Sequence, residues 1–220
     1  MKIKVVIPES LKDIKAADYA RFVQMDIKEQ DLVQQAILYF VGLNEKDLRK
    51  ISAAAITEIG QSTMEALNEI PKLERFVELD GVKYGFHPDL EKMTFGEFVD
   101  LEEYFKEPYK NWQRILGLLY RPVVKESQGR YLIEDYDPDK HNGDALKEVD
   151  AAVLQGALLF FYRLEIALVK DLLTSLEKKG EIPPQAQQQS EKDLGRSGGG
   201  MRQLTHLLGE IYSKWKPSQK

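Results

Sequence analysis

Three aspartates in the run Asp135-Tyr-Asp137-Pro-Asp139 are the first candidates for a functional site, because their carboxylates could bind a metal ion. Alternating acidic side chains begin the calcium loop of an EF-hand, which also needs Gly at its sixth position and a bidentate Glu at its twelfth. Counted from Asp135, those positions hold Lys140 and Leu146. The run therefore predicts an acidic turn before a helix, with a weak calcium or magnesium contact as the alternative.

A second acidic cluster could supply the paired carboxylates of a hydrolase. That use needs a cleft and a perturbed environment, which the sequence does not indicate. Glu97 already fits the cap of a predicted helix, and Asp100 and Glu103 or Glu107 fall on its polar side. We interpret the cluster as a solvated helix face, made of Glu97, Asp100, Glu102, Glu103 and Glu107.

The remaining candidates do not form a catalytic signature. His87, His141 and His206 have no zinc-site spacing and are expected to be solvated or to cap backbone groups. The absence of cysteine excludes disulfides, thiolate metal sites and a Cys nucleophile. The segment Gly195-Arg-Ser-Gly-Gly-Gly lacks the Lys and the preceding strand of a phosphate-binding P-loop, so a flexible tether is expected. The sequence predicts a protein that is not an enzyme and binds no metal or cofactor.

Composition limits the classes further. A chain of 220 residues that is 43% hydrophobic, with nine Phe and ten Tyr, can build a substantial core. Its net charge of −5 argues against non-specific nucleic-acid binding. The apolar run in the N-terminal stretch 1–13 is too short for a signal peptide, so the protein is expected inside the cell that makes it.

The clearest local signal is a β-hairpin. Residues 76–79 and 82–86 flank Asp80-Gly81, a dipeptide that favours a type I′ turn. Gly85 interrupts the second strand, which indicates either a bulge or a close packing contact. Residues 123–124 and 131–133 are expected to form another hairpin across the loop that contains Gly129.

Most other elements are predicted to be helices. Residues 2–7 are expected to form a short strand, and a helix is expected from about Ala16. Thr94 and Glu97 form a capping box that opens a helix in which Phe95 is expected to pack. The other expected helices cover residues 32–41, 44–70 with a break or kink at Gly60, 109–120 and 145–178.

The last of these helices is apolar nearly all round. Charged residues such as Arg163 and Lys170 interrupt it, and a charge inside lipid is costly. We therefore expect a helix buried in a bundle, not a membrane span.

Beyond Gly180 the pattern changes. Residues 181–200 are rich in Gln and Gly and predict a flexible linker. Residues 201–220 predict an amphipathic, basic helix that either docks on its own domain or binds a partner. Its apolar face, the predicted partner-binding surface, holds Met201, Leu204, Leu207, Leu208, Ile211, Tyr212 and Trp215.

Several of these segments together resemble a known family. Most of residues 1–178 is similar to a recurring pattern in tailed-bacteriophage virion-assembly proteins, and resembles tail assembly chaperones in particular. Those are small helical proteins, encoded near the tape-measure gene, that shield the apolar helical tape measure before the tail tube forms. The matching segments are Leu79-Asp-Gly81, Tyr84-Gly-Phe86-x-Pro88, Met93 to Leu101, Leu119-Tyr-Arg-Pro122, Tyr131 to Tyr136 and the helix around Phe160-Phe161.

These observations give the expected organisation and role. The fold class is mainly α with a small β part (α+β): a core domain over residues 1–180, the linker 181–200 and the terminal helix 201–220. The resemblance implies a phage tail assembly chaperone or scaffold in the host cytoplasm, with a tail protein such as the tape measure as partner. The charge pattern predicts no nucleic-acid or membrane partner, and homo-oligomerisation is left open. The alternatives are a structural subunit of the phage particle and a metal-dependent hydrolase that uses the acidic clusters.

Overall fold

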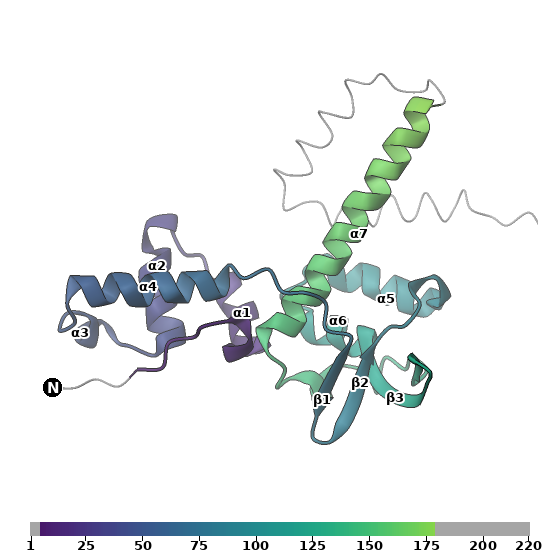
Figure 1. The fold of residues 1–220 in the computed structure, drawn as a ribbon, viewed down its shortest axis with the longest axis horizontal. Coiled ribbons are helices and arrows are strands. Elements are labelled where there is room, and N and C mark those ends of the chain that lie inside the picture. The colour runs from purple at the N-terminus through teal and green to yellow at the C-terminus, as the bar shows by residue number, and fades with distance from the viewer. Residues whose placement is uncertain (1–4, 179–220) are drawn as a thin grey trace, which may run out of the picture.

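The computed structural model describes residues 5–178 and confirms the mainly α class with a small β part (Figure 1). Seven α-helices and four strands follow one another along this part of the chain. The helices are α1 (Ala16–Val23), α2 (Leu32–Ala36), α3 (Glu45–Leu48), α4 (Ala53–Leu67), α5 (Phe95–Phe105), α6 (Trp112–Leu119) and α7 (Ala151–Lys178). The strands are β1 (Phe76–Leu79), β2 (Val82–Phe86), β3 (Tyr120–Ser127) and β4 (Arg130–Ile133).

The strands form one antiparallel sheet in the order β1-β2-β3-β4. Both predicted hairpins are present. Asp80 and Gly81 have φ values of 50° and 76°, as a type I′ turn requires, and Gln128 and Gly129 repeat this with 51° and 75°. Pairing of β2 with β3 joins the two hairpins into a single sheet, with α5 and α6 inserted between them.

A glycine is needed at position 85 of β2 because another side chain packs closely against it, and not because the strand bulges there. The register of β1 against β2 is regular, and the Tyr131 ring lies across Gly85. A Cβ atom at Gly85 would lie 2.5 Å from the Tyr131 Cε2 atom. The Tyr131 hydroxyl also donates a hydrogen bond to the Phe86 carbonyl, which fixes the ring over the glycine.

The main hydrophobic core lies where α6 and the first half of α7 meet the sheet. Every residue from Ala151 to Leu158 is buried. On α6, Ile115, Leu116, Leu118 and Leu119 have no exposed surface. Helix α7 therefore begins as the central core element that its apolar composition predicted.

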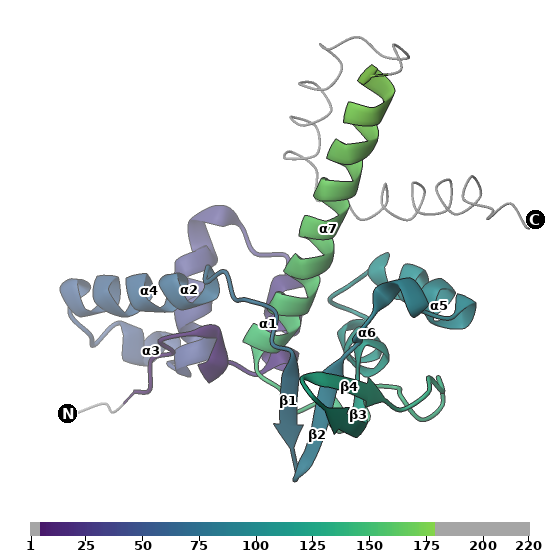
Figure 2. The same ribbon diagram turned by 45° about the vertical axis from the view of Figure 1, so that its right-hand side comes forward.

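The four N-terminal helices extend to one side of this core (Figures 1 and 2). A second cluster, which contains Leu11, Ile14 and Phe22, packs on Ala151 and Ala152 of α7. A third cluster is built from Ile37, Val41, Leu43 and Ile59 and holds α4 against the π-helix Ile37–Val41, which continues α2.

Two predictions for the N-terminal part are wrong. Residues 5–7 do not form a strand, because Val5 and Ile7 pack on the third cluster instead of finding a partner strand. Helix α4 runs through Gly60 without a break. Gly60 instead allows α2 to pack closely against α4, because a Cβ at this position would lie 2.7 Å from the Val33 Cγ1 atom.

The boundaries of three predicted helices also differ. The expected helix over 44–70 is split into α3 and α4, because Ser52 caps the second one by accepting the Ala55 N–H. Helix α6 is shorter than expected, because Tyr120 already belongs to β3. Helix α7 begins at Ala151 and not near residue 145, because the residues before it pair with the N-terminal segment. Asp150 forms a β-bridge with Lys15, and the Val149 carbonyl accepts the Ala16 N–H at 2.9 Å.

The second half of α7 leaves the body of the protein and projects away from it (Figures 1 and 2). By length and composition, residues 151–168 could cross a membrane, but the first eight of them form the protein core. Beyond Phe161 the described side chains are half-buried or exposed.

Candidate functional site

The first turn of α5 organises the most distinctive polar group of the fold. The predicted capping box is confirmed: Glu97 N–H donates to Thr94 Oγ1 at 3.2 Å, and Thr94 N–H donates to Glu97 Oε2 at 2.6 Å. These bonds satisfy two of the N–H groups that a helix start leaves open. They also fix the Glu97 carboxylate against the sheet.

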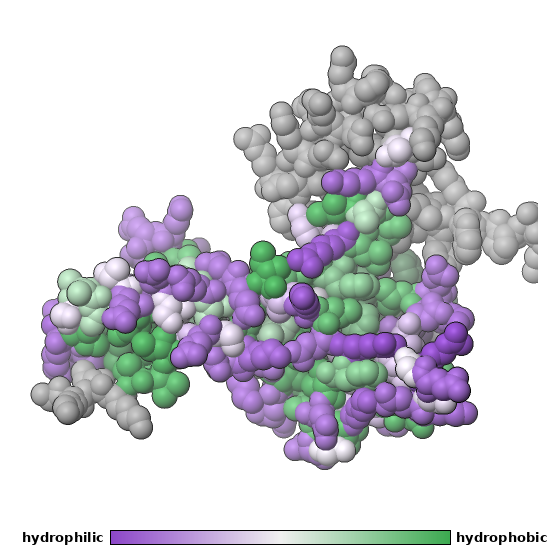
Figure 3. All heavy atoms as spheres, viewed as in Figure 1, coloured by the Kyte–Doolittle hydropathy of each residue, from purple (hydrophilic) through white to green (hydrophobic). Residues whose placement is uncertain are grey.

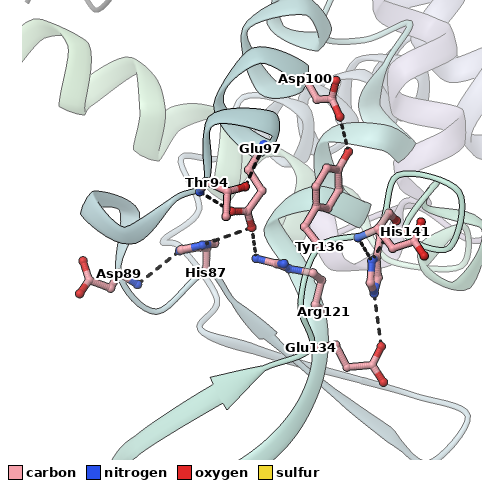
Figure 4. Close-up of polar contacts among 10 residues, drawn as sticks. His87, Asp89, Thr94, Glu97, Asp100, Arg121, Glu134, Tyr136 and His141 are labelled. Atoms are coloured by element: carbon pink, nitrogen blue, oxygen red, sulfur yellow. Dashed lines mark hydrogen bonds and ion pairs between the residues drawn. The ribbon is translucent and has the colours of Figure 1, made fainter. Parts of the chain in front are cut away.

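The second carboxylate oxygen of Glu97 faces two basic side chains (Figure 4). Arg121 of β3 donates to Glu97 Oε1 through Nη2, and His87 Nε2 lies 3.6 Å from the same oxygen. The exposed fractions are 2% for Glu97, 3% for Arg121 and 8% for His87. We call these three residues the Glu97 cluster.

Burial and charge set the protonation states of the cluster. Burial alone would raise the pKa of Glu97, but hydrogen bonds from Thr94 and the positive charge of Arg121 outweigh it, so the pKa lies below its usual value. Burial lowers the pKa of His87, and Arg121 lowers it further against the opposing charge of Glu97. His87 Nδ1 accepts the Asp89 N–H at 3.4 Å, so neutral His87 carries its proton on Nε2, toward Glu97.

Arg121 is left incompletely satisfied. Its Nε atom is buried and has no hydrogen-bond partner within the described chain. A buried guanidinium is costly unless its donors are paired, and here Glu97 is shared with His87 and Thr94.

A cavity of about 770 Å³ opens beside the Glu97 cluster. We call it the strand cavity, because residues 130–136 of β4 and the following loop form one wall. The other wall comes from the segment between β2 and α5. Its lining comprises Arg75, His87, Pro88, Asp89, Lys92, Thr94, Glu97, Arg121 and residues 130–136.

The state of His87 makes a prediction about pH. Because the pKa of His87 is lowered in the folded protein from 6.5, the unfolded chain binds a proton at higher pH than the folded one. Stability contributed by neutral His87 is therefore present above pH 6.5 and is lost as pH falls below it. We expect the free energy of unfolding, measured by urea denaturation between about pH 7.5 and 5.5, to fall less steeply in His87→Gln than in wild type. Equal slopes would contradict this, since the other histidines are common to both proteins.

The acidic run 135–139 forms a turn, in agreement with the preferred interpretation. Asp137 Oδ1 accepts the Asp139 N–H at 3.0 Å, and the Asp137 N–H donates to His141 Nδ1 at 3.0 Å. Within residues 5–178, no three acidic or imidazole side chains come together in a way that could hold a metal ion.

The acidic cluster on α5 and just after it divides into two kinds of residue. Glu103 and Glu107 pair with Lys106 and Lys110 on the solvent side, as predicted for a solvated face. Glu97 does not belong to that face, because it caps the helix from a buried position. Asp100 is also engaged, since its Oδ2 accepts the Tyr136 hydroxyl at 2.9 Å.

The two histidines in the described chain are buried and not solvated. His87 and His141 are each 8% exposed, and each accepts a backbone N–H, which is the capping role that the sequence left open. His206 lies outside the described residues.

Residues 5–178 leave two apolar surfaces partly open. On α7 beyond the core, Ile166 and Leu168 are half-buried and Ala167 is exposed, and hydrophobic surface continues along the helix where it leaves the body (Figure 3). On α5, Phe95 is 80% exposed and Val99, one turn later, is 42% exposed. The expectation that Phe95 packs inside is wrong, because the capping box turns Glu97 inward and leaves the N-terminal Phe95 toward solvent.

The predicted partner-binding face of the terminal helix, Met201 to Trp215, lies outside the described residues, as does the linker 181–200. Comparison with protein-family models, with curated proteins and with solved structures finds no match to this chain.

Proposed function

We propose that this protein is a non-enzymatic assembly chaperone or scaffold of a tailed phage, which binds and shields apolar helical segments of a tail protein such as the tape measure in the host cytoplasm. The observation that carries the proposal is the projecting, apolar second half of α7 (Figures 2 and 3). A long helix anchored in the core at one end offers a rigid apolar surface to a partner helix at the other.

The composition of the projecting segment supports a helical partner. Leu164, Ile166, Leu168, Leu172, Leu173 and Leu176 occur among its residues. Of these, Leu164, Ile166 and Leu168 are half-buried. Apolar surface that is left accessible on a helix is typical of interaction sites. Burying apolar surface contributes about 25 cal/mol of binding free energy per Å². The cost of ordering both partners must be subtracted from this, and the remaining affinity is the modest, reversible one that a chaperone requires.

Phe95 and Val99 on α5 supply a second apolar contact point. The terminal helix 201–220 is proposed to add a tethered one through the face of Met201 to Trp215. Several weak contacts on one chain raise the overall affinity through effective concentration, and release remains fast when one contact opens.

The test is co-expression of the full chain with the tape-measure protein of the same phage, followed by affinity capture. We expect the partner to become soluble and to be captured. The double variant Ile166→Asp/Leu168→Asp should weaken capture by about tenfold or more, since burying each such side chain contributes about 1.5–3 kcal/mol. A parallel variant, Leu207→Asp/Ile211→Asp, tests the terminal helix in the same way.

The matched control is Arg163→Gln/Asp171→Asn, which changes two exposed charges on the same helix and leaves its apolar side chains intact. Equal melting temperatures for the three α7 proteins would show that folding is unaffected. Failure of the wild-type chain to solubilise or capture the partner would overturn the proposal. Stoichiometric amounts of the protein in purified virions, measured by mass spectrometry, would favour a structural subunit instead.

A further inference from the structure

We propose that the strand cavity is a binding site for an oxyanion, a carboxylate or phosphate group that sits beside Arg121 between β4 and the segment before α5. This inference rests on the cavity and the Glu97 cluster, and is independent of the helix-binding role proposed above.

The first support is the state of Arg121. Its side chain is 3% exposed, lines the cavity, and has a buried Nε without a hydrogen-bond partner within the described chain. Nη2 is held by Glu97, so the guanidinium is anchored on one side and unsatisfied on another. An oxyanion entering the cavity would supply the acceptor that this buried cation lacks, in the charge-assisted geometry that arginine favours.

The second support is the charge balance of the cavity wall. Three of its carboxylates are already neutralised: Asp89 by Lys92, Glu97 by Arg121 and Glu134 by Lys140. Among the described residues this leaves Asp135, which forms no ion pair but whose negative charge acts on Arg121, against two further cations. The cations are Arg75, which stacks on Tyr131 with its Cζ atom 4.9 Å from the ring centroid, and Arg130, which has no ion pair within the described chain.

The third support is the position of the α5 N-terminus. Thr94 and Glu97 of its first turn line the cavity, and α5 has 11 residues. The partial positive charge of a helix start favours an anion nearby. Arg121 and this helix start line the cavity from two separate elements, and Arg130 lines it from the far end of β4.

The experiment is NMR titration of the full chain labelled with ¹⁵N-arginine, at constant ionic strength. The probes are sodium phosphate and a short glutamate-rich peptide, with sodium chloride as the salt control. We expect saturable displacement of the Arg121 Nε–H signal by at least one probe below about 10 mM, and none by chloride. Displacement by phosphate alone identifies a phosphate site, and displacement by the peptide identifies an acidic peptide as the source of the oxyanion.

Variants separate a specific site from general attraction. Arg130→Gln should weaken the titrated affinity, because it removes a positive charge from the cavity wall. Lys147→Gln removes an exposed cation outside the cavity and should leave the affinity unchanged. The proposal is overturned if no probe displaces the Arg121 signal, or if Arg130→Gln and Lys147→Gln weaken binding equally.

Discussion

Replacing Glu97 with Ala is expected to lower the free energy of unfolding by about 4 kcal/mol or more. The substitution leaves Arg121 buried without its ion-pair partner, which costs about 3–5 kcal/mol, and removes one half of the capping box, which costs about 1 kcal/mol. Since whole domains are stable by about 5–15 kcal/mol, the loss should be evident as a large shift of the urea midpoint.

A matched control lies on the same helix. Glu103 also pairs with a basic residue, Lys106, but both side chains are more than half exposed, so Glu103→Ala should leave the urea midpoint unchanged within error. The double variant Glu97→Ala/Arg121→Leu should regain part of the stability that Glu97→Ala loses, because it removes the unpaired charge as well. If Glu97→Ala is as stable as wild type, the ion pair with Glu97 does not hold Arg121 in place.

The parts of this fold that sequence reasoning predicted correctly are those decided by neighbouring residues. Asp80-Gly81 fixes a hairpin because two adjacent residues must adopt positive φ values. Thr94 and Glu97 fix a helix start because their side chains bond backbone groups within one turn. In both cases the physical cause lies within four residues.

The Glu97 cluster could not be predicted in this way. Glu97 and Arg121 are 24 residues apart, and they meet only because β3 pairs with β2 after α5 and α6 have intervened. One signal was available: Arg121 is a single charge inside the apolar run from Ile115 to Val124. A charge in such a run is seldom buried without a partner, so the run indicated an acidic residue elsewhere in the chain.

The exposed surfaces were misjudged for a related reason. Periodicity indicated that Phe95 belongs to an apolar helical face, but the position of α5 against the sheet decides which face is covered. For α7, composition correctly predicted that the first half is buried. No local signal shows that the helix extends beyond the hydrophobic core (Figure 1). The face of Met201 to Trp215 remains a prediction.

Replacing Gly143 with Ala is expected to destabilise the protein by about 3 kcal/mol or more. Gly143 has φ of +89° and lies against α6, where an added Cβ would be 2.0 Å from the Gln113 carbonyl oxygen. Left-handed backbone strain costs about 1 kcal/mol or more, and overpacking against immobile backbone adds about 1–3 kcal/mol. Gly117 on α6 faces the same loop, and a Cβ added to it would lie 2.3 Å from the His141 carbonyl oxygen. Neither α6 nor the loop can therefore move easily to make room for a larger residue. Thermal and urea denaturation of the purified variant measure the effect.

Two further glycines separate the contributions to this loss. Gly129 also has a positive φ, +75°, but has open space around its added Cβ, so Gly129→Ala should show the strain of about 1 kcal/mol alone. Gly96 lies in α5 with open space and a helical backbone, so Gly96→Ala should be neutral or stabilising by up to about 1 kcal/mol. The expected order of stability is therefore Gly96→Ala, then Gly129→Ala, then Gly143→Ala. If Gly143→Ala is no less stable than Gly129→Ala, the loop before α7 does not pack on α6 as closely as its backbone contacts require.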